Sequence, residues 1–275
     1  MWSTQHIDPD TKLCWKESGG AQTGSDAIGD ETPIVLLHGF AGQAEDYIAV
    51  ADRLASSGRI LAFDLPAHGG SRDCTVPGHP KAASEAILTA LKNTGVETFH
   101  LCGFSMGGAI ACLMAMSAPE RVRSLTLVAP GGFGPEIGAE ILDKLGGAQS
   151  ETELAMAIQM MAGPDFDLPV SIIQRTVEQR RDPRLAEAQR LLGERLFKGG
   201  VQGMIPRAML ENVRCPVEIV WGTGDPIVPF QQSENRPEAF RLTALPGAGH
   251  MLLAQAPEAV AAAIGRAKRE AGTTA

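Results

Sequence analysis

The sequence has few aromatic residues and no long apolar run. Aromatic side chains make up 5% of the 275 residues, so we expect a core built from Leu, Val, Ile, Ala and Met. The longest apolar run, Ala109–Met116, is far shorter than the roughly 20 residues that a membrane-spanning helix needs. The N-terminus also lacks the basic and apolar regions of a secretory signal. These absences predict a cytoplasmic protein without a membrane partner.

Cysteine and positive charge are scarce as well. The five cysteines are scattered, without a Cys-x-x-Cys pair, which predicts reduced structural thiols and no metal site. The net charge is −8 and would repel a phosphate backbone, so we expect no nucleic-acid partner. Hydrophobic residues make up 44% and charged residues 20%, which is ordinary for a globular protein.

Apolar runs alternate with helical patterns through much of the chain. Continuous apolar runs are typical of strands buried on both faces, and they predict strands at 33–38, 59–64, 98–102, 124–129, 217–221 and 241–245. Helical periodicity predicts helices at 46–57, 81–94, 106–117 and 258–268. A weak edge strand is expected at Leu13–Glu17, followed by a loop at 19–31. This order predicts an α/β protein with a mostly parallel sheet.

The alternation stops after Pro130. Residues 131–210 are helical in pattern throughout, and Gly- and Pro-containing pairs interrupt them without a buried strand. We interpret residues 131–210 as a helical lid inserted into a core formed by residues 1–130 and 211–275. Such a segment between two sheet strands would cover one end of the sheet.

The most informative motif is Gly103-Phe104-Ser105-Met106-Gly107-Gly108. A buried strand precedes it and a helix follows, which is the context that a strained strand-to-helix turn needs to present a nucleophilic serine. Side chains two positions before and after the serine would collide, and glycine at these positions removes the collision. Ser105 is therefore the predicted nucleophile.

A serine hydroxyl needs a base, and the base needs a partner. His250 follows the last predicted strand, and Asp225 follows the strand before it, so both should emerge at the same sheet edge as Ser105. Asp64 also ends a strand but precedes the nucleophile, and we interpret it as a brace for the following loop. The order Ser105, Asp225, His250 is the one expected for a doubly wound sheet of this type.

Two backbone amides are expected to bind the developing oxyanion. The Met106 amide lies at a helix N-terminus directly after the nucleophile. Gly39 lets the loop after the first buried strand turn towards Ser105, which makes the Phe40 amide the second predicted donor.

These motifs together resemble the α/β-hydrolase family: PIVLLHGF, FDLPAHGGS, GFSMGG, WGTGDPIVP and GAGHM. The resemblance implies an eight-stranded, mostly parallel sheet, a Ser–His–acid triad, and no metal or organic cofactor. The segments SLTLVAPGGFGPEIGAEILDKL and EIVWGTGDPIVP are similar to the hydrolase-like domain of acetoin dehydrogenase E2 components. The sequence has no lipoyl attachment site, because its only Asp-Lys pair, Asp143-Lys144, falls in a helical pattern. Association with a lipoyl-bearing complex is left open.

Substrate contacts are predicted less sharply, at His38, Gly39, Phe104, Arg175, Arg207 and Met251. Seven arginines lie between Arg175 and Arg207, and one of them would suit a substrate carboxylate. Interleaved acidic residues favour a solvated, salt-bridged face instead.

Three functions follow from these patterns. The first is a serine hydrolase that acts on a small ester, thioester or activated carbonyl compound through an acyl-enzyme. The second is a hydrolase that cleaves a carbon–carbon bond next to a ketone, as in meta-cleavage hydrolases, which share the triad and a helical lid. The third is a non-catalytic binding or assembly module. A homodimer is left open.

Overall fold

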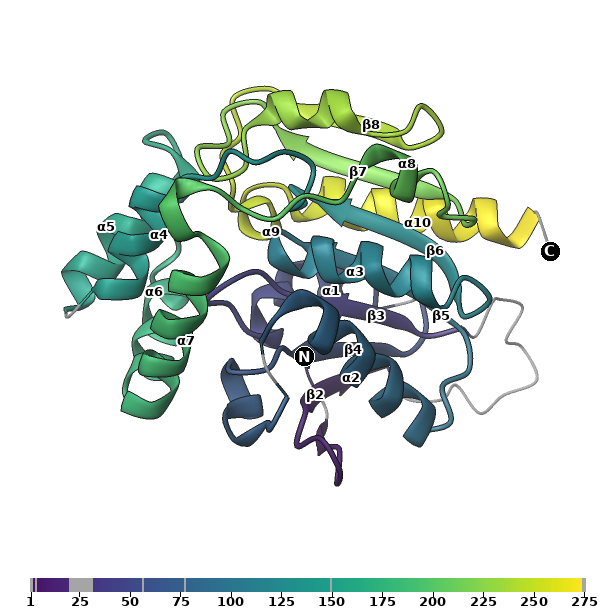
Figure 1. Cartoon of the computed structure of the whole chain (residues 1–275), viewed down its shortest axis with the longest axis horizontal. Helices are drawn as coiled ribbons and strands as arrows, with labels where there is room; N and C mark the ends of the chain where they lie inside the picture. The colour runs from purple at the N-terminus through teal and green to yellow at the C-terminus, as the bar shows by residue number, and fades with distance from the viewer. Residues whose placement is uncertain are drawn as a thin grey trace.

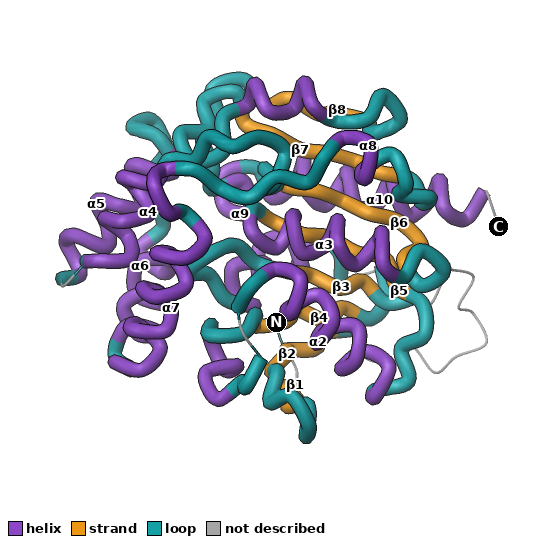
Figure 2. The backbone as a smooth tube through the Cα atoms, in the orientation of Figure 1, coloured by secondary structure: helices purple, strands orange, loops and turns teal. Residues whose placement is uncertain are grey.

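The computed structural model describes residue 2 and residues 4–19, 32–55, 57–76, 78–148 and 150–273. The loop predicted at 19–31 lies outside the described residues, apart from its first position. Within the described ranges an eight-stranded sheet carries helices on both faces (Figures 1 and 2). The predicted α/β architecture is confirmed.

The sheet is parallel except at one side. Its spatial order is β1 (Thr4–Ile7), β2 (Cys14–Ser18), β4 (Ile60–Asp64), β3 (Ile34–Leu37), β5 (Phe99–Phe104), β6 (Val122–Val128), β7 (Val217–Gly222) and β8 (Arg241–Leu245). Strand β2 runs antiparallel to β1 and to β4, and every other neighbouring pair is parallel. All residues of β3, β4, β5 and β7 are buried, as their continuous apolar sequences predict.

The prediction of an edge strand at Leu13–Glu17 was wrong in its position. This segment forms β2, which is the second strand, and the edge is β1. Strand β1 gives no signal in the sequence, because Thr4–Ile7 is short and mostly exposed and has no apolar alternation to mark it. The backbone pairing with β2, rather than side-chain burial, defines this strand.

Helices of the two faces match the predicted pattern with one change. Helices α2 (Pro80–Asn93) and α3 (Met106–Ser117) pack together on one face, while α1 (Ile48–Arg53) and α10 (Pro257–Thr273) pack together on the other (Figure 1). The helix predicted at 46–57 is shorter than expected, since a 3-10 turn at Ala44–Tyr47 precedes α1 and the helix ends at Arg53.

Residues 131–210 connect β6 to β7 and carry the helices α4 (Ala139–Gly147), α5 (Glu151–Ala162), α6 (Val170–Arg180), α7 (Pro183–Leu196) and α8 (Arg207–Leu210). Helices α4 to α7 pack on one another and form a group beside one end of the sheet (Figure 1). An isolated bridge between Glu136 and Val201 ties the two ends of this group together. Helix α8 instead contacts α3. We call residues 131–210 the helical segment.

No helix in the described part of the chain is long and apolar enough to cross a membrane.

Candidate active site

The turn between β5 and α3 holds Ser105 in a backbone conformation that side-chain-bearing residues avoid. Its φ is 53° and its ψ is −118°, a strain that costs on the order of 1–3 kcal/mol. The Ser105 amide donates to the Val128 carbonyl at 2.9 Å, and the Ser105 carbonyl accepts from the Gly131 amide at 3.0 Å. Hydrogen bonds to the neighbouring strand and its following loop therefore hold the strained residue in place.

Glycine is required on both sides of this turn because only backbone fits there. A Cβ on Gly107 would lie 2.3 Å from the Leu37 carbonyl oxygen and 2.4 Å from that of His38. A Cβ on Gly103 would lie 2.3 Å from the Gly107 carbonyl oxygen. Helix α3 thus begins in direct backbone contact with the end of β3.

The structure brings Ser105, His250 and Asp225 together. The His250 Nε2 lies 3.0 Å from Ser105 Oγ, and His250 Nδ1 lies 2.7 Å from Asp225 Oδ2. Their exposed fractions are 9%, 1% and 7% in the order Ser105, His250, Asp225. A carboxylate at Nδ1 fixes the tautomer in which Nδ1–H donates, so Nε2 is free to accept the serine proton. This arrangement can activate a hydroxyl.

Asp225 is positioned by its own loop. Its Oδ1 accepts from the amides of Ile227 at 2.8 Å and Val228 at 2.9 Å, which leaves Oδ2 for the imidazole. The loop follows directly from the buried end of β7, where a Cβ on Gly222 would lie 2.3 Å from the Ala248 carbonyl oxygen. The two loops that carry the acid and the base are thus packed against each other.

The helical segment contacts the base from the other side. The His250 amide donates to the Met161 carbonyl in the last turn of α5 at 2.8 Å. Gln255 Nε2 donates to the Ala162 carbonyl at 3.0 Å, and a Cβ on Gly249 would lie 2.5 Å from that same oxygen. Helix α5 therefore helps to fix the loop that carries His250.

The two predicted oxyanion donors flank the nucleophile. Within the described residues, neither the Phe40 amide nor the Met106 amide has a hydrogen-bond acceptor. A Cβ on Gly39 would lie 3.1 Å from Ser105 Cβ, so the backbone before Phe40 passes close to the serine. The Phe40 ring reaches the other way and meets the Phe197 ring edge-on, with centroids 5.3 Å apart.

Two buried histidines brace the loop that carries Phe40. His38 Nε2 accepts from the Leu65 amide at 3.0 Å, and His68 Nε2 accepts from the Ala41 amide at 3.0 Å. Each ring's Nδ1 lies within 2.9 Å of a backbone carbonyl oxygen, to which it donates. Burial lowers the pKa of His38 to about 4 and that of His68 to about 3. Both rings are therefore neutral scaffolding at neutral pH.

Asp64 takes the bracing place that the sequence predicted. Its Oδ1 accepts from the Ala44 amide at 2.8 Å and its Oδ2 accepts from the Gly70 amide at 2.9 Å. Burial raises the pKa of this carboxyl group, and the two backbone hydrogen bonds oppose that shift. The carboxylate joins the loop after β3 to the loop after β4.

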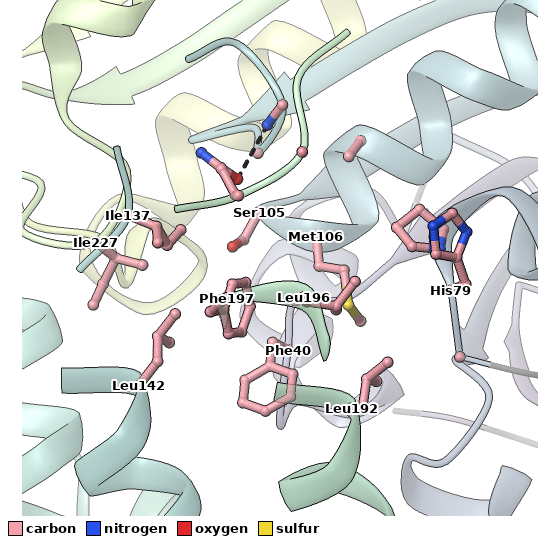
Figure 3. A pocket seen from close by; sticks show the side chains of 18 of the residues that line it. Phe40, His79, Ser105, Met106, Ile137, Leu142, Leu192, Leu196, Phe197 and Ile227 are labelled. Atoms are coloured by element: carbon pink, nitrogen blue, oxygen red, sulfur yellow. Dashed lines mark hydrogen bonds between the residues drawn. The ribbon is translucent and has the colours of Figure 1, made fainter. Parts of the chain in front are cut away.

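A cavity of about 480 Å³ opens at Ser105 (Figure 3). The predicted site residues Gly39, Phe40, Phe104, Ser105, Met106 and His250 line it. Most of its wall is apolar, with Ile137, Leu142 and Ile227 to one side of Ser105 in Figure 3, and Leu192, Leu196 and Phe197 below it. Such a cavity suits an apolar acyl chain more than a polar one.

Four of the predicted substrate contacts lie elsewhere. His38 is fully buried behind the cavity wall with both ring nitrogens bonded to backbone. Arg207 pairs with Glu211 on its own helix. Arg175 and Met251, like the other two, are absent from the described lining of the cavity. Arg207 is exposed, and Arg175 lies near Asp46, where burial raises the pKa of the carboxyl group and the charge of Arg175 opposes that shift.

A different arginine, Arg195, lines the cavity, together with His79, Lys81 and Gln202. Helical spacing could have identified Arg195, because it lies three residues after Leu192 and thus on the same face of α7. His79 precedes α2 and Lys81 lies in its first turn, between the FDLPAHGGS and GFSMGG motifs, and no local pattern connects them to Ser105.

The structure combines a mostly parallel sheet with a hydrogen-bonded serine, histidine and aspartate at the carboxyl ends of its strands. This combination is typical of one class of proteins. The chain matches the model of the alpha/beta hydrolase family over residues 34–263. It therefore belongs to that family, as the sequence motifs predicted.

Sequence relatives include the dihydrolipoyllysine-residue acetyltransferase components of the acetoin cleaving systems of Pseudomonas putida and Cupriavidus necator. They are 33% and 30% identical over 90% and 86% of this chain, which spans only 64% and 60% of their lengths. A pimeloyl-[acyl-carrier protein] methyl ester esterase from Nitrosomonas europaea is 27% identical over 85% of this chain and 94% of its own. Among solved structures, a meta-cleavage product hydrolase from Pseudomonas fluorescens superposes with a TM-score of 0.81 at 16% identity, covering 98% of both chains.

The requirement for glycine at the serine turn is testable. Gly107→Ala is expected to lower the free energy of unfolding by about 3 kcal/mol or more, because the added methyl group meets two rigid carbonyl oxygens. Gly146→Ala is the matched control, since a Cβ there has no neighbour within 4 Å, and it should be neutral or stabilising by about 0.5–1 kcal/mol. Urea denaturation measures both. Equal stabilities for the two variants would contradict the packing argument.

The histidine brace predicts a pH dependence. In the native state the pKa values of His38 and His68 are lowered to about 4 and about 3. Between pH 6.5 and about 4 these two histidines are therefore protonated in the unfolded chain but stay neutral in the native state. The free energy of unfolding should therefore fall as the pH drops, by about 1.4 kcal/mol per pH unit for each ring. Urea denaturation at pH 6 and pH 4.5 measures how the free energy of unfolding changes with pH. For His68→Gln this change should be smaller than in the wild type by about 1.4 kcal/mol per pH unit, because one of the two rings is missing. Identical slopes would show that His68 is protonated in the native state.

Proposed function

We propose that this protein is a serine hydrolase that acts on an ester, thioester or activated carbonyl substrate through an acyl-enzyme. The observation that carries the proposal is the continuous path from Asp225 through His250 to Ser105, with 2.7 Å and 3.0 Å between the bonded atoms. A strained, nearly buried serine with an aligned base gives no advantage to a binding module, so a catalytic role accounts for the geometry better.

In the proposed reaction, Ser105 Oγ attacks the substrate carbonyl carbon while His250 Nε2 takes the hydroxyl proton. The negative charge moves to the carbonyl oxygen, which the Phe40 and Met106 amides bind. Each such donor is worth about 2.7–4 kcal/mol of barrier. His250 then returns the proton to the leaving group, and water, deprotonated by the same ring, releases the acid from Ser105.

We further propose that the helical segment serves as a lid. In support, α7 supplies Leu192 and Leu196 to the cavity, and the loop after α7 supplies Phe197. These side chains shelter the space beside Ser105 from water, which strengthens electrostatic interactions in the site. The division into a core of residues 1–130 and 211–275 and a lid of residues 131–210 belongs to this proposal.

The names of the relatives suggest two reactions within this class. Two of the relatives are named for acyl transfer in an acetoin cleaving system, and one is named for ester hydrolysis. We favour hydrolysis, because the relative named for ester hydrolysis is matched over 94% of its own length. The five free thiols suit the proposed cytoplasmic location.

A fluorophosphonate probe tests the nucleophile. It should label the wild-type protein, fail to label Ser105→Ala, and still label Ser117→Ala, a control at the end of the same helix α3. Asp225→Asn should lower the turnover of a nitrophenyl ester by about 10³–10⁴-fold, because the imidazole loses its fixed tautomer. Labelling of a folded Ser105→Ala variant would defeat the assignment.

Substrate ranking separates ester hydrolysis from carbon–carbon bond cleavage. We expect nitrophenyl acetate and an acyl thioester to turn over faster than a vinylogous diketone, measured as kcat/KM. Faster decay of the diketone would favour the carbon–carbon hydrolase that the fold also accommodates. A folded wild type that turns over none of the three, with no probe labelling, would favour a binding module.

A further inference from the structure

We propose that Lys81 and Arg195 form a cationic rim, with His79 beside them as a hydrogen-bond donor through Nε2, and that this rim binds an anionic group of the substrate, phosphate or carboxylate, remote from the reacting carbonyl. The inference rests on the proposed hydrolase function and adds the substrate class. All three residues line the same cavity as Ser105, and they come from the start of α2 and the end of α7.

In the part of the chain that the structure describes, the charged groups of Lys81 and Arg195 have no acidic partner. Among the described residues no carboxylate forms an ion pair with Lys81 or Arg195, although the chain as a whole carries a net charge of −8. The neighbouring acids Glu187 and Glu194 on α7 pair with Arg190 instead. No aspartate or glutamate lies in the described lining of the cavity. The rim is therefore a local excess of positive charge on an acidic protein.

The rim is also separated from the serine by apolar wall. In Figure 3, Met106 and Leu196 lie between Ser105 and His79, and Leu192 lies below them. Lys81, His79 and Arg195 are exposed to solvent, whereas Leu192 is buried. A ligand that reaches both Ser105 and the rim thus needs an apolar or neutral stretch between its carbonyl and its charge.

Two substrates share this chemistry. In one, the leaving group carries phosphate, as in a coenzyme A thioester; in the other, the acyl chain ends in a carboxylate. Each places a charge at the solvent-exposed mouth while the reacting carbonyl sits beside Ser105. Exposed ion pairs are weak individually, so the rim would act by adding two or three small contributions.

Steady-state kinetics on matched substrate pairs tests the rim. The pairs are a butyryl-coenzyme A thioester against the neutral N-acetylcysteamine thioester, and a nitrophenyl ester of a dicarboxylic acid with one free carboxylate against its methylated form. The double variant Lys81→Gln/Arg195→Gln should raise KM for a charged member by roughly 2- to 25-fold, because each exposed pair contributes about 1.5- to 5-fold. KM for the neutral members should stay unchanged.

Lys92→Gln is the matched control, since it removes one charge from the other end of α2 and lies outside the described cavity lining. It should leave all four KM values unchanged. The wild-type KM for the preferred charged substrate should also rise between 0.05 M and 0.5 M NaCl, because salt screens exposed charges. An effect confined to the thioester pair identifies phosphate as the anion, and one confined to the ester pair identifies carboxylate.

Equal KM changes for charged and neutral members, or no change for any, would overturn the rim proposal. Fluorophosphonate labelling of Ser105 distinguishes this failure from failure of the hydrolase itself. If labelling persists in the double variant, the proposal of a serine hydrolase stands and only the rim proposal is rejected. Protection of Ser105 from labelling by free coenzyme A or by a dicarboxylate, lost in the double variant, supports the rim without requiring turnover.

Discussion

The close backbone contact between the start of α3 and the end of β3 is the constraint on which the site depends. At Gly107 the helix lies so near the carbonyls of Leu37 and His38 that no side chain fits between them. That proximity forces the chain to reverse within one residue, which places Ser105 at a positive φ. The same contact brings the loop after β3, with its Phe40 amide, beside the serine. One backbone contact thus positions both Ser105 and the Phe40 amide.

The outer parts of the site are held by polar atoms that sit in the interior. His38, His68 and Asp64 each bridge backbone groups of the loops after β3 and β4. Because they are buried, their hydrogen bonds are not exchanged with water, and each would leave an orphaned amide if removed. The loop geometry near the nucleophile is therefore specified by side chains that do not touch the cavity, with His38 the clearest example.

The parts of this structure that follow from the sequence are those with local signals. Buried parallel strands carry continuous apolar runs, and helix α3 and strand β8 were predicted with the bounds that the structure has. The positions of Ser105, Asp225 and His250 were predictable because each lies in the turn or loop that follows a parallel strand, directly after β5 for Ser105 and within a few residues of β7 and β8 for the other two. Strand β1 was not, since it is held by its pairing with β2 and by the cross-strand contact of His6 with Trp15, which no local pattern encodes.

The cavity lining was predictable only in part. Gly39, Phe40, Phe104 and Met106 are adjacent to motifs, but Lys81 and Arg195 meet at the cavity through the packing of α7 near the loop before α2. The sequence analysis placed Arg175 among the substrate contacts, but its Nε is buried without a hydrogen-bond partner in the described structure, and Arg175 does not line the cavity. Which arginine faces the cavity depends on the angles between helices, and those are set by tertiary packing rather than by spacing along one helix.

The hydrogen bond from the His250 amide to Met161 has a mechanical consequence. Helix α5 cannot swing away from the sheet without displacing the imidazole, because the same short loop carries both attachments. Among the described residues, α6 and α7 make no hydrogen bond to this loop. A displacement of α6 and α7 alone would widen the entrance to the cavity and leave His250 aligned between Ser105 and Asp225.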